Sequence, residues 1–268
     1  MTAREILRSG ELPQREMLIL LAHHLDVDQA TLYRDLDEDV PEPTHRKLLH
    51  DVARRKDGWP LQYLTGRAWF WSLPLAVGPG VLVPRPETEC LVEAACRLAP
   101  VGARLCDVGT GSGAILAALS MERPDLRLSG VEKSLRALHC AERNLGERAE
   151  LYEGDLCRPL PDRQDVLVAN LPYVSAADYA TLPADVLREP RAALLGGPDG
   201  LDLIRRLVRQ APDHLTEGGW LLLEVGAGQA QTVADLLEQR GFAEIFRDRD
   251  LAGIERVVGG RWTCAPNS

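Results

Sequence analysis

The sequence predicts a two-part α/β protein, in which a small helical module precedes a mainly parallel β-sheet covered by helices on both faces. Apolar residues recur at helical spacing through residues 1–57, where no glycine stands between Gly10 and Gly58. From about residue 82, short apolar runs alternate with amphipathic segments, as parallel sheets require. The 268 residues are 45% hydrophobic and 26% charged, which excludes a wholly disordered or fibrous chain.

Residues 1–57 are expected to form a helical substrate-recognition domain. Leu18, Leu21 and Leu25 share one helical face, and Leu48 and Val52 share another. The next segment, residues 58–81, contains three of the five tryptophans, and its alternation predicts a β-hairpin or extended linker.

Residues 82–268 form the main domain in this interpretation. The last two predicted strands have no helix between them, so we expect an antiparallel pair at an edge of the sheet. The predicted strands are 103–108, 126–132, 149–154, 165–170, 220–225, 243–247 and 253–259, and the predicted helices between them are 114–121, 134–145, 201–215 and 230–240.

Composition and charge restrict the function. The net charge of -9 disfavours tight, non-specific binding of nucleic acid, which requires basic surface. No apolar run reaches the roughly 18 residues of a membrane helix, and the charged N-terminus lacks a signal-peptide core, so we expect a cytoplasmic protein. Scattered cysteines without a C-x-x-C pair predict reduced thiols and no metal site. They are Cys90, Cys96, Cys106, Cys140, Cys157 and Cys264.

A glycine-rich turn follows the first strand of the main domain and opens the next helix. Its glycines let the backbone approach a ligand, and the helix N-terminus presents free N–H groups. Gly109, Gly111 and Ala114 also fit the dinucleotide fingerprint, so the turn alone leaves NAD open. The candidate binding residues here are Asp107, Gly109, Thr110, Gly111, Ser112 and Gly113.

Two further strand ends carry candidate cofactor residues. Glu132 ends the second strand, where an acid accepts hydrogen bonds from both ribose hydroxyls of a nucleoside cofactor. Asp155 and Leu156 follow the third strand, at the sheet edge where an adenine ring would lie. Asp155 could accept from the exocyclic amine, and Leu156 could cover the ring.

The segment Asn170-Leu171-Pro172-Tyr173 follows the fourth strand and is close to the Asn-Pro-Pro-Tyr motif of methyltransferases that act on planar amino groups. Such a nitrogen is a weak nucleophile because its lone pair is delocalised. The Asn170 side-chain oxygen and the Leu171 carbonyl can accept its two N–H groups, and Tyr173 can stack on its flat face. Pro172 biases Leu171 toward an extended conformation, and positioning then supplies much of the rate.

With these residues, nearly the whole chain resembles the bacterial release factor glutamine methyltransferases. The resemblance extends to the stretches 60–66, 83–89, 189–191 and 252–256. It implies a Rossmann-like, seven-stranded methyltransferase domain that transfers a methyl group from S-adenosylmethionine to the N5 amide nitrogen of the Gln in the Gly-Gly-Gln motif of release factors, leaving S-adenosylhomocysteine. Arg85, Pro86 and Glu189 then become candidate substrate-binding residues, and we expect a monomer.

Two positions depart from the family pattern. Leu171 stands where the family has proline, so the carbonyl contact is kept but the fixed φ is lost, and we expect a less preorganised pocket. Glu132 stands where aspartate is common, and its longer side chain should still reach the ribose.

Four alternatives share part of this pattern. A sister enzyme that methylates a Gln of a ribosomal protein has the same motif. A DNA or RNA exocyclic-amine methyltransferase would need a basic surface, for which Arg188 and Arg191 are candidates. A dehydrogenase leaves residues 83–89 and 170–173 unexplained, and a cofactor-binding scaffold without catalysis is favoured only by Leu171.

Overall fold

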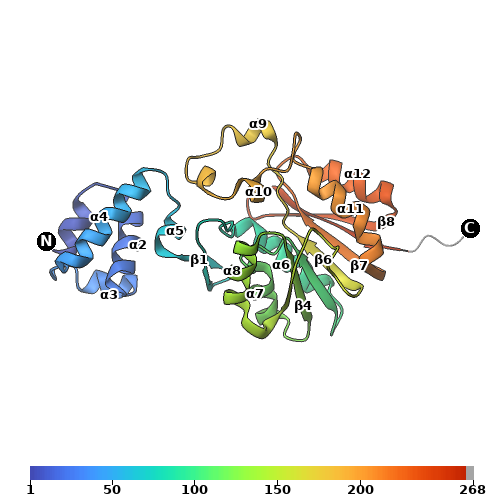
Figure 1. The fold of residues 1–268 in the computed structure, drawn as a ribbon, viewed down its shortest axis with the longest axis horizontal. Helices are drawn as coiled ribbons and strands as arrows, with labels where there is room; N and C mark the ends of the chain where they lie inside the picture. The colour runs from blue at the N-terminus through green and yellow to red at the C-terminus, as the bar shows by residue number, and fades with distance from the viewer. Residues whose placement is uncertain (264–268) are drawn as a thin grey trace, which may run out of the picture. The chain divides into compact units, whose positions relative to one another are not determined.

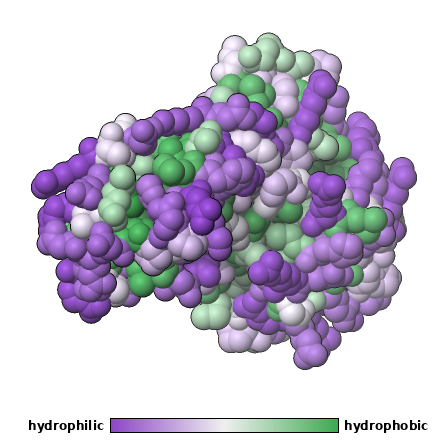
Figure 2. Space-filling view, turned by 60° about the vertical axis from the view of Figure 1, so that its left-hand side comes forward, coloured by the Kyte–Doolittle hydropathy of each residue, from purple (hydrophilic) through white to green (hydrophobic). Residues whose placement is uncertain are grey.

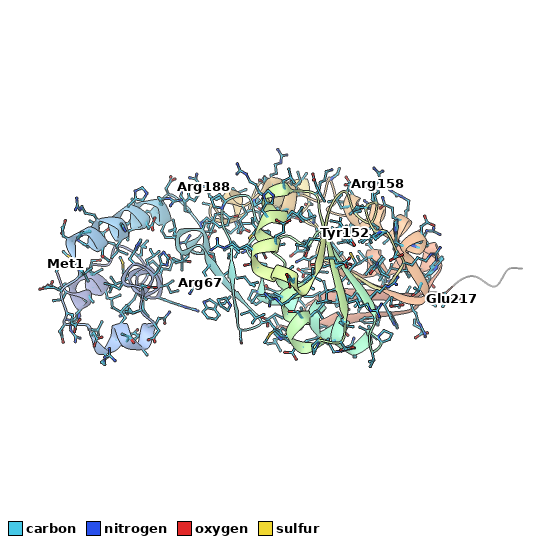
Figure 3. The ribbon with its side chains drawn as sticks, turned by 60° about the horizontal axis from the view of Figure 1, so that its bottom comes forward. Met1, Arg67, Tyr152, Arg158, Arg188 and Glu217 are labelled. Atoms are coloured by element: carbon cyan, nitrogen blue, oxygen red, sulfur yellow. The ribbon has the colours of Figure 1, made fainter. Side chains whose placement is uncertain are left out.

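The computed structural model describes residues 1–263, and the chain divides into two compact units. The first unit comprises Met1–Arg67 and the later segment Pro183–Arg188, and the second comprises the rest. Arg67 and Arg188, at the ends of the two stretches of the first unit, are labelled in Figure 3. The five cysteines within residues 1–263 are free thiols, whereas Cys264 lies outside the described residues.

The first unit is helical, as the sequence predicts. Thr2 and Glu5 form a capping box on its first helix, and the Asp28 side chain caps the third helix by accepting from the Thr31 N–H at 2.7 Å. The helices are α1 (Ala3–Arg8), α2 (Gln14–Leu25), α3 (Gln29–Arg34), α4 (Glu42–Lys56), α5 (Leu61–Thr65) and the 3-10 helix η3 (Val186–Arg188).

Part of the predicted hairpin linker is helical instead. Residues 61–65 form α5, because Pro60 precedes its first turn and Gly66 ends it in the left-handed conformation. The hairpin itself is confirmed as β1 (Arg67–Phe70) and β2 (Leu73–Ala76). Pro183–Arg188 joins the first unit through ion pairs of Asp185 with Arg55 at 3.3 Å and of Arg188 with Asp57 at 2.6 Å.

The second unit contains a seven-stranded mixed sheet among the described residues, in the order β5-β4-β3-β6-β7-β9-β8. Figure 1 labels β4, β6, β7 and β8 of this sheet. The pairs from β5 to β7 are parallel, and β9 pairs antiparallel with both β7 and β8. The predicted antiparallel edge pair is therefore confirmed. The strands are β3 (Arg104–Val108), β4 (Arg127–Glu132), β5 (Glu150–Glu153), β6 (Gln164–Ala169), β7 (Leu215–Glu224), β8 (Phe242–Arg249) and β9 (Glu255–Trp262).

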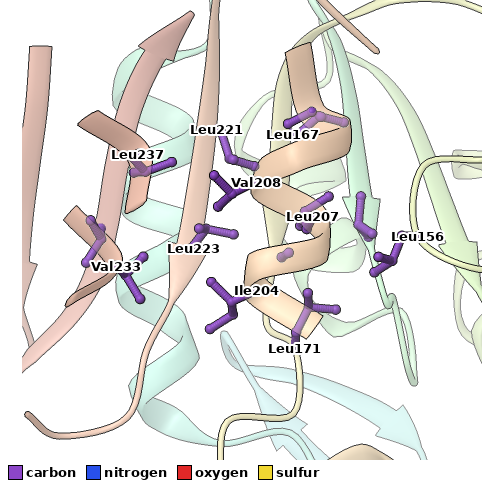
Figure 4. Close-up of a cluster of buried hydrophobic side chains, with 14 of the residues drawn as sticks. Leu156, Leu167, Leu171, Ile204, Leu207, Val208, Leu221, Leu223, Val233 and Leu237 are labelled. Atoms are coloured by element: carbon purple, nitrogen blue, oxygen red, sulfur yellow. The ribbon is translucent and has the colours of Figure 1, made fainter. Parts of the chain in front are cut away.

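Alternate residues of each strand point to opposite faces of the sheet, and apolar side chains stand on both faces. Helices therefore cover both faces. Leu221 and Leu223 belong to one buried cluster with α11 and α12 (Figure 4), whereas Leu222 belongs to another with α6 and α7. The longer helices are α6 (Glu89–Leu98), α7 (Ala114–Glu122), α8 (Leu135–Leu145), α11 (Asp202–His214) and α12 (Ala230–Arg240). The short ones are η1 (Pro86–Thr88), η2 (Gly146–Arg148), α9 (Ala176–Tyr179) and α10 (Arg191–Leu194).

Most apolar side chains are taken up by these clusters and by a third one within the first unit. The face shown in Figure 2 is accordingly mostly hydrophilic, with hydrophobic residues in small patches. In the part of the chain that the structure describes, none of the helices has the length and apolar character to cross a membrane.

Candidate active site

The strand order reverses between β3 and β6, because β4 and β5 lie on one side and β7 lies on the other. Ligands of open α/β sheets bind outside the carboxyl ends of the strands at such a reversal. The glycine-rich turn follows β3, and Asn170 follows β6. The topology therefore brings the two sequence motifs to one place in the fold.

The glycine-rich turn is held by acids at the ends of two neighbouring strands. The Thr110 hydroxyl donates to Asp107 Oδ2 at 2.8 Å, and the Gly111 N–H donates to Glu132 Oε2 at 2.9 Å. Gly109, Gly111 and Gly113 all have positive φ, and a Cβ at Gly113 would stand 2.9 Å from the Leu145 side chain. The turn therefore requires glycine for both its conformation and its packing.

Asp107 is a buried acid beside the glycine-rich turn. The residue is 1% exposed, and Oδ1 is buried with no hydrogen bond from residues 1–263. Burial raises the pKa of Asp107 to about 7, and Glu132 adds to the rise while the Thr110 hydroxyl opposes it. A buried acceptor of this kind beside a glycine turn fits a ligand that brings a cationic or N–H donor.

Glu132 already accepts two backbone hydrogen bonds. Its second oxygen, Oε1, accepts from the Ser134 N–H at 2.8 Å, so the carboxylate joins the glycine turn to the start of α8. Each oxygen keeps a further lone pair for a ribose hydroxyl. Its role as a ribose acceptor remains a prediction, and the structure adds a role in ordering the turn.

Asp155 and Leu156 have different environments, since Asp155 forms ion pairs and Leu156 packs into the core. The Asp155 carboxylate forms ion pairs with Arg206 and, at 3.4 Å, with Lys133, so its oxygens are directed toward cations. Leu156 has φ 57° and is 7% exposed, with its side chain in the same buried cluster as Leu171 (Figure 4). Contacts of either residue with an adenine ring remain predictions.

The Asn170–Tyr173 segment is held by residues far away in the sequence. Asn170 Nδ2 donates to Thr88 Oγ1 at 2.9 Å, and the Tyr173 hydroxyl lies 3.4 Å from Glu224 Oε1. Gln229 Nε2 donates to the Tyr173 carbonyl at 2.9 Å. Leu171 is 4% exposed and packs into the core (Figure 4), and its Cδ2 would lie 3.1 Å from a Cβ at Gly109.

The chain just before α11 packs against the Asn170–Tyr173 segment and the residue that follows it. The Val174 N–H donates to the Leu194 carbonyl at 3.0 Å, and the Gly196 N–H donates to the Val174 carbonyl at 2.9 Å. A Cβ at Gly196 would stand 2.3 Å from the Pro172 carbonyl oxygen, and one at Gly200 would stand 2.1 Å from that of Tyr173. These glycines allow the two backbones to pack directly together.

The predicted substrate-binding residues Arg85 and Glu189 form a pair. Glu189 is 4% exposed, bonds the Arg85 guanidinium and accepts from the Val83 N–H at 2.9 Å. Pro86 begins the 3-10 helix that ends at Thr88. The pair therefore connects the 83–88 stretch to the chain that follows Asn170–Tyr173, and direct contact with a substrate stays a prediction.

The proposed basic patch is largely occupied by internal contacts. Within the first unit Arg188 pairs with Asp57, and within the second Arg191 lies over the Tyr179 ring at 5.5 Å. Sequence reasoning missed Glu224, Gln229 and Gly196 altogether. Glu224 ends an apolar run, so only its position at the carboxyl end of a strand could have indicated a role.

Comparisons with known proteins agree with this arrangement. A family model for the PrmC N-terminal domain matches residues 1–66, and one for the methyltransferase small domain matches residues 87–197. The chain is 44% identical to the release factor glutamine methyltransferase of Geobacter sulfurreducens, over 90% of this chain and 87% of that protein. It is 40% identical to that of Pseudomonas aeruginosa, over 97% and 98%.

Solved structures support the fold. A methyltransferase from Pyrococcus furiosus is 16% identical and matches 84% of this chain and 100% of that chain with a TM-score of 0.56. The T. thermophilus 16S rRNA N2 G1207 methyltransferase, solved with AdoMet and guanosine, is 22% identical and matches 73% of this chain and 49% of that chain with a TM-score of 0.53. At these identities the likeness extends to the methyltransferase fold alone.

Proposed function

We propose, since the chain belongs to the release factor glutamine methyltransferase family, that it transfers a methyl group from S-adenosylmethionine to the side-chain amide nitrogen of the Gly-Gly-Gln glutamine of peptide chain release factors. The observation that carries this proposal is the meeting of the glycine turn after β3 with Asn170–Tyr173 after β6 at the reversal of strand order.

The residues around the glycine turn fit this cofactor. Asp107 offers one buried oxygen, Oδ1, which accepts no hydrogen bond within residues 1–263 and could accept from an ammonium group, and Glu132 offers further lone pairs for ribose hydroxyls. When bound, the cofactor supplies an electrophilic methyl group on a sulfonium. Asp107, the turn 109–113 and Glu132 would hold it, with Leu156 against the adenine.

The acceptor side of the reaction depends on orientation rather than on a base. The Asn170 oxygen and the Leu171 carbonyl accept the two N–H groups of the substrate amide, and Tyr173 packs against its flat face. This fixes the nitrogen in line with the methyl group and removes rotational freedom before reaction. The methylated nitrogen becomes acidic and loses its proton easily, so no strong base is required.

The helical first unit is proposed to bind the release factor away from its glutamine, and such remote binding helps to position the reacting amide. A release factor whose motif glutamine is replaced by alanine should then still bind and inhibit methylation of the intact factor competitively. Absence of inhibition at concentrations well above the KM would contradict recognition away from the glutamine.

We further propose that the protein acts as a monomer in the cytoplasm and does not bind nucleic acid directly, with the net charge of -9 in support of the last point. Light scattering would test the monomeric state, and the salt dependence of any retention on duplex DNA would test the absence of direct nucleic-acid binding.

The direct test is transfer of a labelled methyl group from S-adenosylmethionine to purified, unmodified release factor. Label should appear on the motif glutamine and be lost when that glutamine is replaced, and Asn170→Ala should lower the rate by about a hundredfold. Label on a ribosomal protein instead of the release factor would identify the sister reaction, and label on a nucleic acid would overturn protein methylation.

A further inference from the structure

Two buried polar residues, Thr88 and Glu224, contact the methyl-accepting motif and are not used by the mechanism above. With Asn170 and Tyr173 they form a polar cluster that joins three segments of the second unit, namely the 83–88 stretch, residues 170–173 and the end of β7. Thr88 is 4% exposed and Glu224 is 1% exposed. Asn170 Nδ2 lies 2.9 Å from Thr88 Oγ1, and the Tyr173 hydroxyl lies 3.4 Å from Glu224 Oε1.

Glu224 is short of hydrogen-bond donors. Its Oε2 is buried without a hydrogen bond from any residue that the structure describes, and the contact from Tyr173 is long. Burial raises the pKa of Glu224 to about 7 and Glu87 raises it further, whereas the Thr88 hydroxyl, Arg256 and the Tyr173 hydroxyl lower it. The Thr88 hydroxyl is therefore one of three groups that favour the ionised carboxylate, together with Arg256 and Tyr173.

The single proton of Thr88 determines how Asn170 can face it. A threonine hydroxyl donates one hydrogen bond and accepts others. When Thr88 donates toward Glu224, its oxygen can only accept from Asn170, so the amide nitrogen of Asn170 turns toward Thr88. If Asn170 were flipped, its oxygen would compete with Glu224 for that proton and leave a buried carboxylate unsatisfied.

We propose that Thr88 and Glu224 are positioning residues that fix the orientation of the Asn170 amide, so that its oxygen rather than its nitrogen meets the substrate amide N–H. A flipped Asn170 would present N–H groups to the N–H groups of the substrate, and the acceptor nitrogen would lose one of its two contacts. This inference deepens the proposed function and rests on it for its kinetic consequences.

The proposal predicts a dependence on pH. Glu224 faces Thr88 and Glu87 from the 83–88 stretch, Tyr173 from the catalytic motif and Arg256 from β9. When the carboxyl becomes protonated below about pH 7, it no longer requires the Thr88 proton, and Thr88 can donate to a flipped Asn170. The rate of methyl transfer should therefore fall as the pH is lowered through this range.

Thr88→Val removes the hydroxyl and keeps the shape of the side chain, whereas Thr88→Ser keeps the hydroxyl. We expect Thr88→Val to lower kcat for release factor methylation by about tenfold to a hundredfold, with the KM for S-adenosylmethionine unchanged and with activity restored by Thr88→Ser. Glu224→Gln should remove the fall in rate near pH 7. The matched control is Thr216→Val, which removes a hydroxyl that donates to Asp165 at 3.0 Å from the other end of β7.

The Asn170 side chain can also be observed directly, without any activity. The chain has three asparagines, Asn144, Asn170 and Asn267, so labelling with 15N-asparagine gives three side-chain amide pairs, and Asn170→Ala assigns one of them. Thr88→Val should move the Asn170 pair and accelerate its hydrogen exchange. The Asn144 pair, which donates to the Ala76 and Ser112 carbonyls at 2.9 Å, should stay in place.

The outcomes separate the two proposals. An unmoved Asn170 pair, an unchanged kcat in Thr88→Val, or an equal loss in Thr88→Ser or Thr216→Val would overturn the positioning role. If the wild-type protein does not methylate the release factor, the proposed function fails, and the amide spectra still decide whether Thr88 orients Asn170.

Discussion

The two turns that meet at the reversal of strand order are stabilised in opposite ways. The turn after β3 is held by nearby chain, since Thr110 and Asp107 are 3 residues apart and Gly111 and Glu132 are 21 apart. The segment after β6 is held by distant chain, since Asn170 and Thr88 are 82 residues apart and Tyr173 and Gln229 are 56 apart. The proposed cofactor site therefore depends on local structure, whereas the proposed methyl-accepting segment depends on contacts between distant parts of the second unit.

The sharpest way to break the distant turn is at Gly200. Its φ is +81° and an added Cβ would stand 2.1 Å from the Tyr173 carbonyl oxygen, whereas Gly228 has φ +83° and no described atom within 4 Å. Gly228→Ala should cost only about 1 kcal/mol of stability for its positive φ. Gly200→Ala should cost more than about 3 kcal/mol and abolish methyl transfer, because backbone must move.

Urea denaturation and single-turnover methylation of both variants test this difference. Equal stability losses in the two variants would mean that the close approach of Gly200 to Tyr173 is not a constraint.

A buried carboxyl group contacts each of these two segments, Asp107 through Thr110 and Glu224 through Tyr173, and both groups should make stability depend on pH. Asp107 and Glu224 have folded-state pKa values of about 7, above those of the unfolded chain. Between about pH 4 and 7 the folded state thus binds more protons, so both contributions to stability are complete at low pH and are lost as the pH rises toward 7. The expected loss is on the order of 3 kcal/mol for each group.

Urea midpoints of the ligand-free protein from pH 4.5 to 8 check this expectation. Asp107→Asn and Glu224→Gln should each flatten the decline relative to the wild-type protein. A decline parallel to that of the wild-type protein in either variant would show that the altered group stays ionised in the fold.

The local turn should respond separately at Glu132. Glu132→Ala removes the acceptor of the Gly111 and Ser134 N–H groups as well as the proposed ribose contact. Loss of hydrogen bonds to a charged group predicts S-adenosylmethionine binding that is about tenfold to a hundredfold weaker, with the release factor KM little changed. Calorimetric titration would check this, and normal affinity would remove Glu132 from the cofactor site.

The same contrast explains what could be predicted from the sequence. Strands, the antiparallel edge pair and the glycine turn follow from local patterns, and Glu132 follows from its place at a strand end. The helix α5 could not be predicted, because it has only five residues between Pro60 and Gly66 and lies in a stretch whose alternation predicts a strand. The pairing of Asp155 with Arg206 and of Thr88 with Asn170 joins residues 51 and 82 positions apart, which no local pattern indicates.

The smallest expected effect concerns Leu171, where the family has proline. Leu171→Pro fixes φ and should raise the single-turnover rate by about twofold to fivefold, provided that the native backbone suits the ring. The structure adds an opposing term, because the Leu171 side chain is buried in the core and contacts the Gly109 turn. Leu171→Ala is the matched control, since it removes most of this packing without fixing φ.

Packing and backbone restriction are separated by the difference between these two variants. Both should be less stable than the wild-type protein, because loss of the buried leucine side chain costs about 2 kcal/mol or more. Only the proline variant should methylate faster in a single turnover. A rate for Leu171→Pro that is unchanged or lower than that of the wild-type protein would mean that the distant contacts from Gln229 and the Gly196 loop already hold this backbone, so that proline adds no order to it.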